Sequence, residues 1–129
     1  MIETMPLILL VDDDDCFAAA LASVLEQAGY KLLRAGDGKA ALRLYDPQTV
    51  SLVLTDLVMP EMEGMDLISR LRQQHPDVKI IAMSGGEINF AKTYLRAARL
   101  VGADYILEKP FSKAQLLMAI HQGLPPMPV

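Results

Sequence analysis

The feature that most constrains the fold is a fivefold alternation of short aliphatic runs with segments of helical periodicity. Each run has the length of a strand and is bounded by charged residues, glycine or proline. The runs are apolar along their whole length, which is typical of strands that are covered on both faces. The pattern therefore predicts an α/β fold with a doubly wound, five-stranded parallel sheet. The runs are PLILLV (6–11), YKLLRA (30–35), SLVLT (51–55), VKIIAM (78–83) and DYILE (104–108).

Five helices are expected after these runs, because apolar residues recur there at spacings of three and four. Gly29 and Pro76 mark the ends of two of them, and Ser112 supplies an N-cap side chain for the last. Asp14 and Asp15 are expected to cap the first helix, since acidic groups suit a first turn. The expected helices cover residues 17–28, 37–46, a segment around 67–71, residues 90–101 and residues 112–120.

The length and composition of the chain fit one soluble domain. The 129 residues are 52% hydrophobic and 22% charged, and no apolar run approaches the ~18 residues of a membrane span. The single cysteine, Cys16, is expected to be a small buried residue, and a reducing cytoplasm is the expected location. The net charge of −4, without a lysine or arginine cluster, argues against direct binding to nucleic acid, and no membrane partner is expected. Residues 1–123 are predicted to form the domain, and residues 124–129 a flexible tail.

Polar residues stand directly after four of the predicted strands. Asp12 and Asp13 follow the first strand, Asp56 the third, Ser84 the fourth and Lys109 the fifth. Because parallel strands deliver their carboxyl ends to one edge of the sheet, these five side chains should meet there.

Such a group of side chains has a definite chemistry. Three carboxylates within ~4 Å repel one another by roughly 4 kcal/mol per pair at an effective dielectric of about 20. Mg²⁺ suits a site of this kind, because it prefers oxygen ligands and completes its shell with water and phosphate oxygens. Lys109 and Ser84 can contact a phosphoryl group. We therefore expect phosphoryl transfer to Asp56, with Asp12 and Asp13 holding the metal.

Four motifs in order, LVDDDD, LTDLVMPEMEG, AMSGG and EKPF, resemble those of response-regulator receiver domains over about residues 7 to 123. The resemblance implies a flavodoxin-like sheet of strand order 2-1-3-4-5, an order that the pattern alone does not provide. It further implies that the Lys109–Pro110 bond is cis, although only ~5–6% of X-Pro bonds in folded proteins are.

The resemblance also assigns roles to the site residues. Asp56 would take a phosphoryl group from the phosphohistidine of a sensor histidine kinase or a histidine phosphotransfer protein, and would signal to an effector protein. Asp13 would bind Mg²⁺ directly and Asp12 largely through water, and the Val58 backbone carbonyl would be a further ligand. Ser84 and Lys109 would contact the phosphoryl group. The chain would catalyse only its own phosphorylation and dephosphorylation at Asp56.

Two other functions stay open at this stage. One is a Mg²⁺-dependent phosphohydrolase that forms an aspartyl-phosphate, although Val58 stands where such an enzyme would carry a second acid or base. The other is a degenerate receiver that serves only as a docking module. The complete set of site residues argues against it.

Ile106 replaces the aromatic residue usual in receivers, and Tyr105 should point to the opposite face. Coupling of the site to the surface is therefore expected through Ser84 and residues 85–90.

Overall fold

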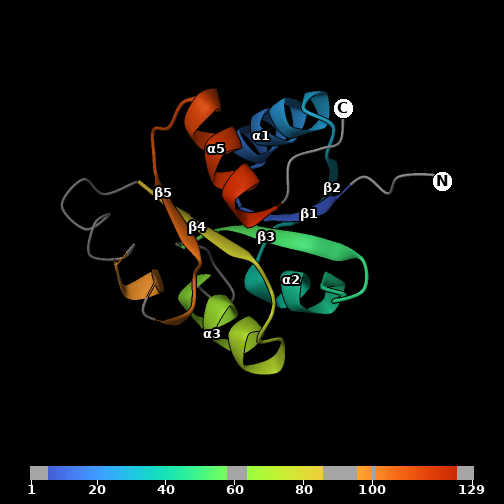
Figure 1. Ribbon diagram of the computed structural model, residues 1–129, viewed down its shortest axis with the longest axis vertical. Coiled ribbons are helices and arrows are strands. Elements are labelled where there is room, and N and C mark those ends of the chain that lie inside the picture. The colour runs from blue at the N-terminus through green and yellow to red at the C-terminus, as the bar shows by residue number, and fades with distance from the viewer. Residues whose placement is uncertain (1–5, 58–63, 86–95, 100, 125–129) are drawn as a thin grey trace.

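A computed structural model describes residues 6–57, 64–85, 96–99 and 101–124 of the chain (Figure 1). Its five strands form one parallel sheet of order β2-β1-β3-β4-β5. Both the fold class and the strand order are therefore confirmed. The strands are β1 (Leu7–Val11), β2 (Lys31–Ala35), β3 (Val50–Asp56), β4 (Ile80–Ser84) and β5 (Tyr105–Glu108).

The helices cover both faces of this sheet. In Figure 1, α1 and α5 lie on one face and α2 and α3 on the other. Residues 96–99 are also helical, but most of the helix expected over residues 90–101 lies outside the described residues. The helices are α1 (Asp15–Gln27), α2 (Gly38–Leu44), α3 (Gly64–Gln74) and α5 (Lys113–Gly123).

Short polar side chains start three of these helices. Asp14 is the N-cap of α1 and accepts a hydrogen bond of 3.1 Å from the Phe17 backbone N–H. Asp37 caps α2 in the same way, and Ser112 starts α5 with a capping box. The expected capping role of Asp14 is confirmed, while Asp15 lies exposed in the first turn. A cap of this kind contributes about 1 kcal/mol, so the acidic run also fixes where α1 begins.

Successive side chains along each strand point alternately into two apolar layers, one on each face of the sheet. Ile8 and Leu10 of β1 pack in the cluster beneath α1 and α5, whereas Leu9 and Val11 pack in the cluster beneath α2 and α3. All four side chains are fully buried, and each contributes about 1.5–3 kcal/mol relative to an exposed side chain. This two-sided burial explains why the strand sequences are apolar throughout.

Two features at the ends of helices bear on the sequence expectations. Cys16 is exposed, so the expectation that it is buried was wrong. Leu124 caps α5 and is buried, and residues 125–129 lie outside the described residues, so the flexible tail stays a prediction. Within the described ranges, no helix is both long and apolar enough to cross a membrane.

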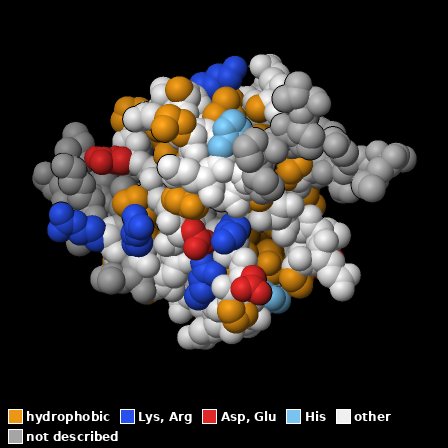
Figure 2. Space-filling view, in the orientation of Figure 1, with side chains coloured by type: hydrophobic (Ala, Val, Ile, Leu, Met, Phe, Trp, Pro, Cys, Tyr) orange, Lys and Arg blue, Asp and Glu red, His pale blue; other side chains and the backbone are white. Residues whose placement is uncertain are grey.

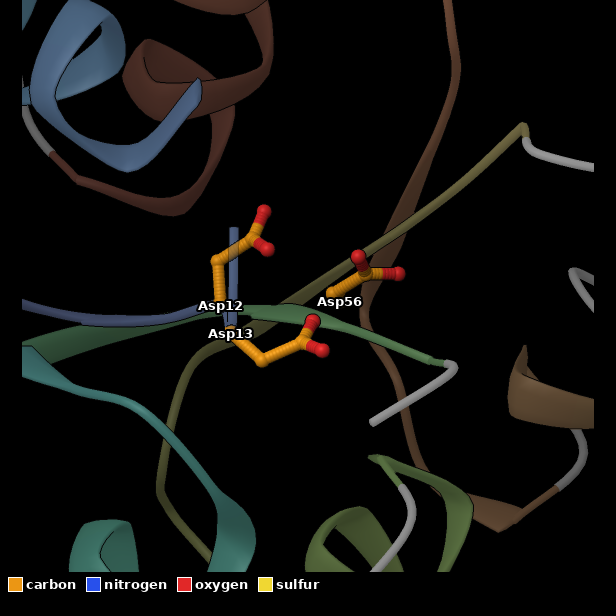
Figure 3. Close-up of side chains that lie close together, drawn as sticks. All are labelled: Asp12, Asp13 and Asp56. Carbon is orange, nitrogen blue, oxygen red and sulfur yellow. The ribbon is translucent and has the colours of Figure 1, made fainter. Parts of the chain in front are cut away.

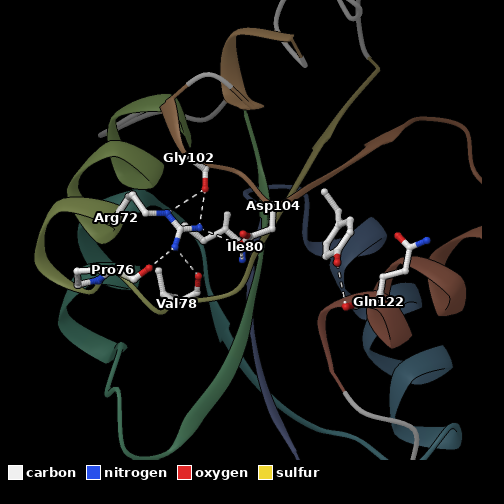
Figure 4. A network of polar contacts seen from close by, with 8 residues as sticks. Arg72, Pro76, Val78, Ile80, Gly102, Asp104 and Gln122 are labelled. Carbon is white, nitrogen blue, oxygen red and sulfur yellow. Dashed lines mark hydrogen bonds and ion pairs between the residues drawn. The ribbon is translucent and has the colours of Figure 1, made fainter.

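A network around Arg72 joins α3 to the amino ends of β4 and β5 (Figure 4). The guanidinium donates five hydrogen bonds of 2.6–3.1 Å to backbone carbonyls and to the Asp104 carboxylate. The same Asp104 oxygen accepts from the Ile80 backbone N–H at 2.8 Å. The carbonyl acceptors belong to Pro76, Val78 and Gly102.

Charged side chains of both signs share the face of the molecule that Figure 2 shows. Among the residues described there, lysine and arginine side chains are interrupted by acidic and apolar ones. The described residues of this face therefore form no continuous basic surface.

Candidate functional site

Asp12, Asp13 and Asp56 come together at the carboxyl ends of β1 and β3. The two strands are neighbours in register, with Val11 beside Thr55, so the residues that follow them are adjacent. One carboxylate oxygen from each aspartate lies within 4.8 Å of the others (Figure 3). The predicted convergence of these three aspartates is therefore present.

The three carboxylates differ in their environments. Asp12 is 2% exposed, Asp13 is exposed and Asp56 is half-buried. Asp12 Oδ1 accepts a hydrogen bond of 2.9 Å from the Asp14 backbone N–H. Its other oxygen, Oδ2, is buried and has no hydrogen-bond partner among the described residues. An oxygen in this position is suited to a cationic ligand.

The pKa of Asp12 is raised, chiefly because burial disfavours the charged carboxylate. The Asp14 N–H and the Lys109 ammonium act in the opposite direction and lower this pKa, while the Asp56 and Asp13 carboxylates raise it. Burial is therefore the main reason why the charged form of Asp12 is disfavoured, and the two neighbouring carboxylates add to it.

Lys109 brings its ammonium group to these carboxylates from the end of β5. Its Nζ lies 3.2 Å from Asp56 Oδ2, within hydrogen-bond distance, and 3.6 Å from Asp12 Oδ2. The Lys109–Pro110 bond is cis, as expected. The Lys109 backbone N–H donates to the Ser84 carbonyl at 2.8 Å, so the ends of β4 and β5 are tied together. Ser84 itself is buried at the end of β4.

Two glycines allow the backbone to close around the site. A Cβ built on Gly85 would lie 2.7 Å from the Lys109 carbonyl oxygen, and one built on Gly64 would lie 2.7 Å from Leu57 Cα. Both distances are shorter than ordinary contacts, so a side chain at either position would displace the chain next to Lys109 or Asp56. The sequence analysis did not identify these roles, although a glycine directly after a strand-end serine is a recognisable signal.

Phe17 is a further residue that the sequence analysis did not place at the site. The sequence analysis placed it only at the start of the first expected helix, over residues 17–28. In the structure its ring lies beneath the Lys109 ammonium, with Nζ 4.1 Å from the ring centroid. Phe111 contacts this ring edge-on, at 6.0 Å between centroids and an interplanar angle of 75°.

Other expectations for the site have mixed outcomes. Val58 lies outside the described residues, as do residues 86–90 of the segment expected to couple site and surface. Ile106 packs against the cluster beneath α2 and α3, and Tyr105 against the cluster beneath α1 and α5. The expected opposition of these two side chains is confirmed.

The donor set fits a magnesium ion. It consists of carboxylate oxygens only, and one of them is buried without a hydrogen bond. Mg²⁺ binds through few carboxylates and keeps water and phosphate oxygens in its remaining positions. A thiolate or imidazole ligand, which zinc sites usually contain, is missing from the cluster of described acidic groups.

A parallel sheet with acidic residues, a serine and a lysine at the carboxyl ends of its strands is the architecture of phosphoryl-accepting signalling domains. Comparison with known families agrees, because the family described as "Response regulator receiver domain" matches residues 8–121. The chain belongs to this family. It is therefore a receiver domain with a phosphoryl-acceptor role in two-component signalling.

Relatives of known function are similar to the chain over most of its length. It is 36% identical to the response regulator receiver protein CpdR of Brucella abortus, covering 93% of this chain and 98% of that protein. It is also 36% identical to the sensor kinase CckA of the same organism, covering 91% of this chain but only 12% of that protein. A receiver domain structure from Clostridium thermocellum superposes with a TM-score of 0.86 at 25% identity, covering 93% of this chain and 94% of that one.

Proposed function

We propose that Asp56 is the residue that accepts the phosphoryl group. The observation that carries this proposal is the 3.2 Å contact between Asp56 Oδ2 and Lys109 Nζ at the end of the central strand β3. Asp12 is a poor candidate, because it is almost fully buried and its pKa is raised by that burial. Asp13 is exposed and lies beyond the end of β1. This position suits a metal ligand better than a nucleophile that must be fixed in place.

The donor in this proposal is the phosphohistidine of a sensor histidine kinase or a histidine phosphotransfer protein in the cytoplasm. An oxygen of Asp56 attacks phosphorus, a P–O bond forms, and the P–N bond breaks with its electron pair returning to the imidazole nitrogen. The Lys109 ammonium then leaves the Asp56 oxygen and contacts a phosphoryl oxygen. The Ser84 hydroxyl donates a hydrogen bond to a second phosphoryl oxygen. Later attack of water on phosphorus restores the Asp56 carboxylate and releases inorganic phosphate.

A metal ion supports this chemistry by neutralising charge on the phosphoryl oxygens. The residues proposed to hold Mg²⁺ are Asp12, Asp13 and Asp56, together with the Val58 backbone carbonyl. The Asp12 Oδ2 atom, which has no hydrogen bond among the described residues, supports its inclusion. Phosphorylation would signal by changing the affinity of the domain for an effector protein.

Asp56 can be tested with a small phosphoryl donor. Incubation with acetyl phosphate and Mg²⁺ should add one phosphoryl mass that hydroxylamine removes, as expected of an acyl phosphate, and Asp56→Asn should abolish the addition. Asp66→Asn, which changes an exposed carboxylate on α3, is the matched control and should be phosphorylated normally. An unchanged adduct on Asp56→Asn would place the phosphoryl group elsewhere. Release of many equivalents of phosphate from a generic phosphate ester would instead indicate a phosphohydrolase.

A further inference from the structure

The environment of the Lys109 ammonium has two unlike sides. On one side are the carboxylates of Asp56 and Asp12, at 3.2 and 3.6 Å. On the other is the face of the Phe17 ring, 4.1 Å from Nζ at its centroid. The Lys109 side chain is only 21% exposed, so much of the water that would normally solvate this charge is excluded. A cation that is partly desolvated in this way is attracted more strongly by an aromatic face.

The two kinds of contact constrain the ammonium differently. A hydrogen bond to a carboxylate oxygen is directional and holds Nζ at one position. Attraction to the ring quadrupole is less directional, so Nζ can shift across the ring face and keep it. When Lys109 changes partner from Asp56 to a phosphoryl oxygen, the ring can therefore stabilise both positions.

Two elements that flank the site set the orientation of the ring. Phe17 is in the first turn of α1, where its backbone N–H donates to the N-cap carboxylate of Asp14. Phe111 follows the cis Lys109–Pro110 bond and contacts the Phe17 ring edge-on. Both rings are partly buried against the cluster beneath α1 and α5. The start of α1 and the end of β5 therefore fix the ring beneath the lysine.

We propose that Phe17 is a positioning residue for Lys109. Its ring keeps the ammonium inside the site, so that Lys109 meets a phosphoryl oxygen without first being recruited from solvent. This inference rests on the proposed roles of Asp56 and Lys109, and it adds a residue from α1 to the phosphoryl-binding apparatus. Its loss should weaken the affinity for a phosphoryl group more than it weakens the fold.

The contact itself can be tested without any phosphoryl group. Protons above an aromatic face are shifted upfield, so the ε-methylene protons of Lys109 should have an anomalous NMR shift, assigned by its loss in Lys109→Arg. Phe17→Leu should return the signal to the normal lysine range, and Phe17→Tyr should retain the anomaly. A normal Lys109 signal in the wild-type protein would overturn the inference.

The consequence can be tested with beryllofluoride, a phosphoryl mimic, in the presence of Mg²⁺. Phe17→Leu should weaken its affinity by up to about tenfold, because without the ring the Lys109 ammonium of the free protein can leave the site for solvent and must return when the mimic binds. The limit is set by the scale of a partly desolvated cation–π contact. Phe17→Tyr should restore the affinity. Val24→Ala removes apolar contacts from the same helix and cluster, and its affinity should stay within about twofold of wild type. In a Lys109→Met background, Phe17→Leu should have no further effect.

The outcomes separate this inference from the proposed function. If the wild-type protein and Asp56→Asn bind beryllofluoride equally, the proposed role of Asp56 is wrong. If the wild-type protein binds the mimic, Asp56→Asn does not, and Phe17→Leu binds it as tightly as wild type, Asp56 keeps its role and the positioning role of Phe17 is wrong. Equal weakening by Phe17→Leu and Val24→Ala would also overturn it, because loss of packing would then explain the effect.

Discussion

The sheet carries a cluster of charged groups at each end, and the two clusters differ in how completely their polar atoms are paired. At the amino ends of β4 and β5, Arg72 donates five hydrogen bonds, and Asp104 accepts from both Arg72 and Ile80. At the carboxyl ends of β1 and β3, three carboxylates lie close together, one ammonium contacts two of them, and Asp12 Oδ2 is buried without a hydrogen bond among the described residues.

This difference in pairing indicates that the Arg72 network is a structural site and that the aspartate cluster is a binding site. A buried polar group that is fully paired holds elements together and has little left to offer a ligand. An incompletely paired group costs free energy in the isolated protein, and a ligand that completes it recovers that cost. The Arg72 network should therefore govern stability, and the aspartate cluster should govern binding at some expense of stability.

The largest effect is expected when the paired cluster is broken. Arg72→Met removes the guanidinium donor from the Asp104 carboxylate and from three backbone carbonyls, and should lower the free energy of unfolding by about 3 kcal/mol. Arg70→Met is the matched control on the same helix. Its ion pair with Asp66 is exposed on both sides, so its loss should cost at most about 0.5 kcal/mol.

Urea unfolding of the two variants measures this contrast. Arg72→Met should still be phosphorylated by acetyl phosphate under conditions where it is folded, because Arg72 lies at the opposite end of the sheet from Asp56. Equal stability of both variants would contradict a structural role for the network.

An effect of opposite sign is expected at Asp12, in the aspartate cluster. Without Mg²⁺, Asp12→Asn should raise the free energy of unfolding by about 1 kcal/mol, because it removes a buried charge whose Oδ2 atom accepts no hydrogen bond among the described residues. Asp15→Asn removes the same charge from an exposed side chain and should change stability little. Mg²⁺ should raise the melting temperature of the wild-type protein and of Asp15→Asn, but much less that of Asp12→Asn. A lower stability of metal-free Asp12→Asn would refute this view of the site.

The same residue predicts how stability depends on pH. The pKa of Asp12 is raised above its ordinary value of 3.8, so the folded state binds this proton more tightly than the unfolded state does. The free energy of unfolding of the metal-free protein should therefore fall as pH rises from 3.8 through the raised pKa. Urea unfolding in a metal chelator over this range should show the fall in the wild-type protein, and Asp12→Asn should lack the Asp12 component.

Much of the fold and the aspartate cluster could be predicted because both depend on local pattern. Short apolar strands that alternate with helices imply a parallel sheet, and a parallel sheet brings Asp12 and Asp56 to one edge. The strand order needed the family resemblance, because periodicity does not say which strands are neighbours. Cys16 was misplaced for a local reason, since it precedes Phe17 and a step of one residue turns a helical side chain by about 100°.

The contacts that could not be predicted join segments far apart in the chain. Arg72 donates to the Gly102 carbonyl and to the Asp104 carboxylate, about thirty positions away, and no sequence motif marks these acceptors. Phe17 meets Lys109 through the same kind of long-range packing. In the sequence both residues have a sufficient local explanation, as a charged residue near a helix end and as part of an apolar stripe. Only the tertiary structure distinguishes these roles from ordinary ones.

The smallest expected effect extends the comparison to two tyrosines. Tyr30 is buried, and its hydroxyl has no hydrogen-bond partner among the described residues, whereas the Tyr105 hydroxyl donates to the Gln122 carbonyl at 3.0 Å. Tyr30→Phe should raise the free energy of unfolding by about 0.5 kcal/mol, and Tyr105→Phe should lower it by a similar amount. Urea unfolding at neutral pH tests whether the two changes in the free energy of unfolding have opposite signs.

Burial also raises the pKa of Tyr30, so wild-type stability should fall as pH rises above 10.0, and Tyr30→Phe should lack that component. A loss of stability in Tyr30→Phe at neutral pH would show that this hydroxyl does form a hydrogen bond. The stability cost that we assign to Asp12 Oδ2 would then lose its support, because it rests on the same kind of observation.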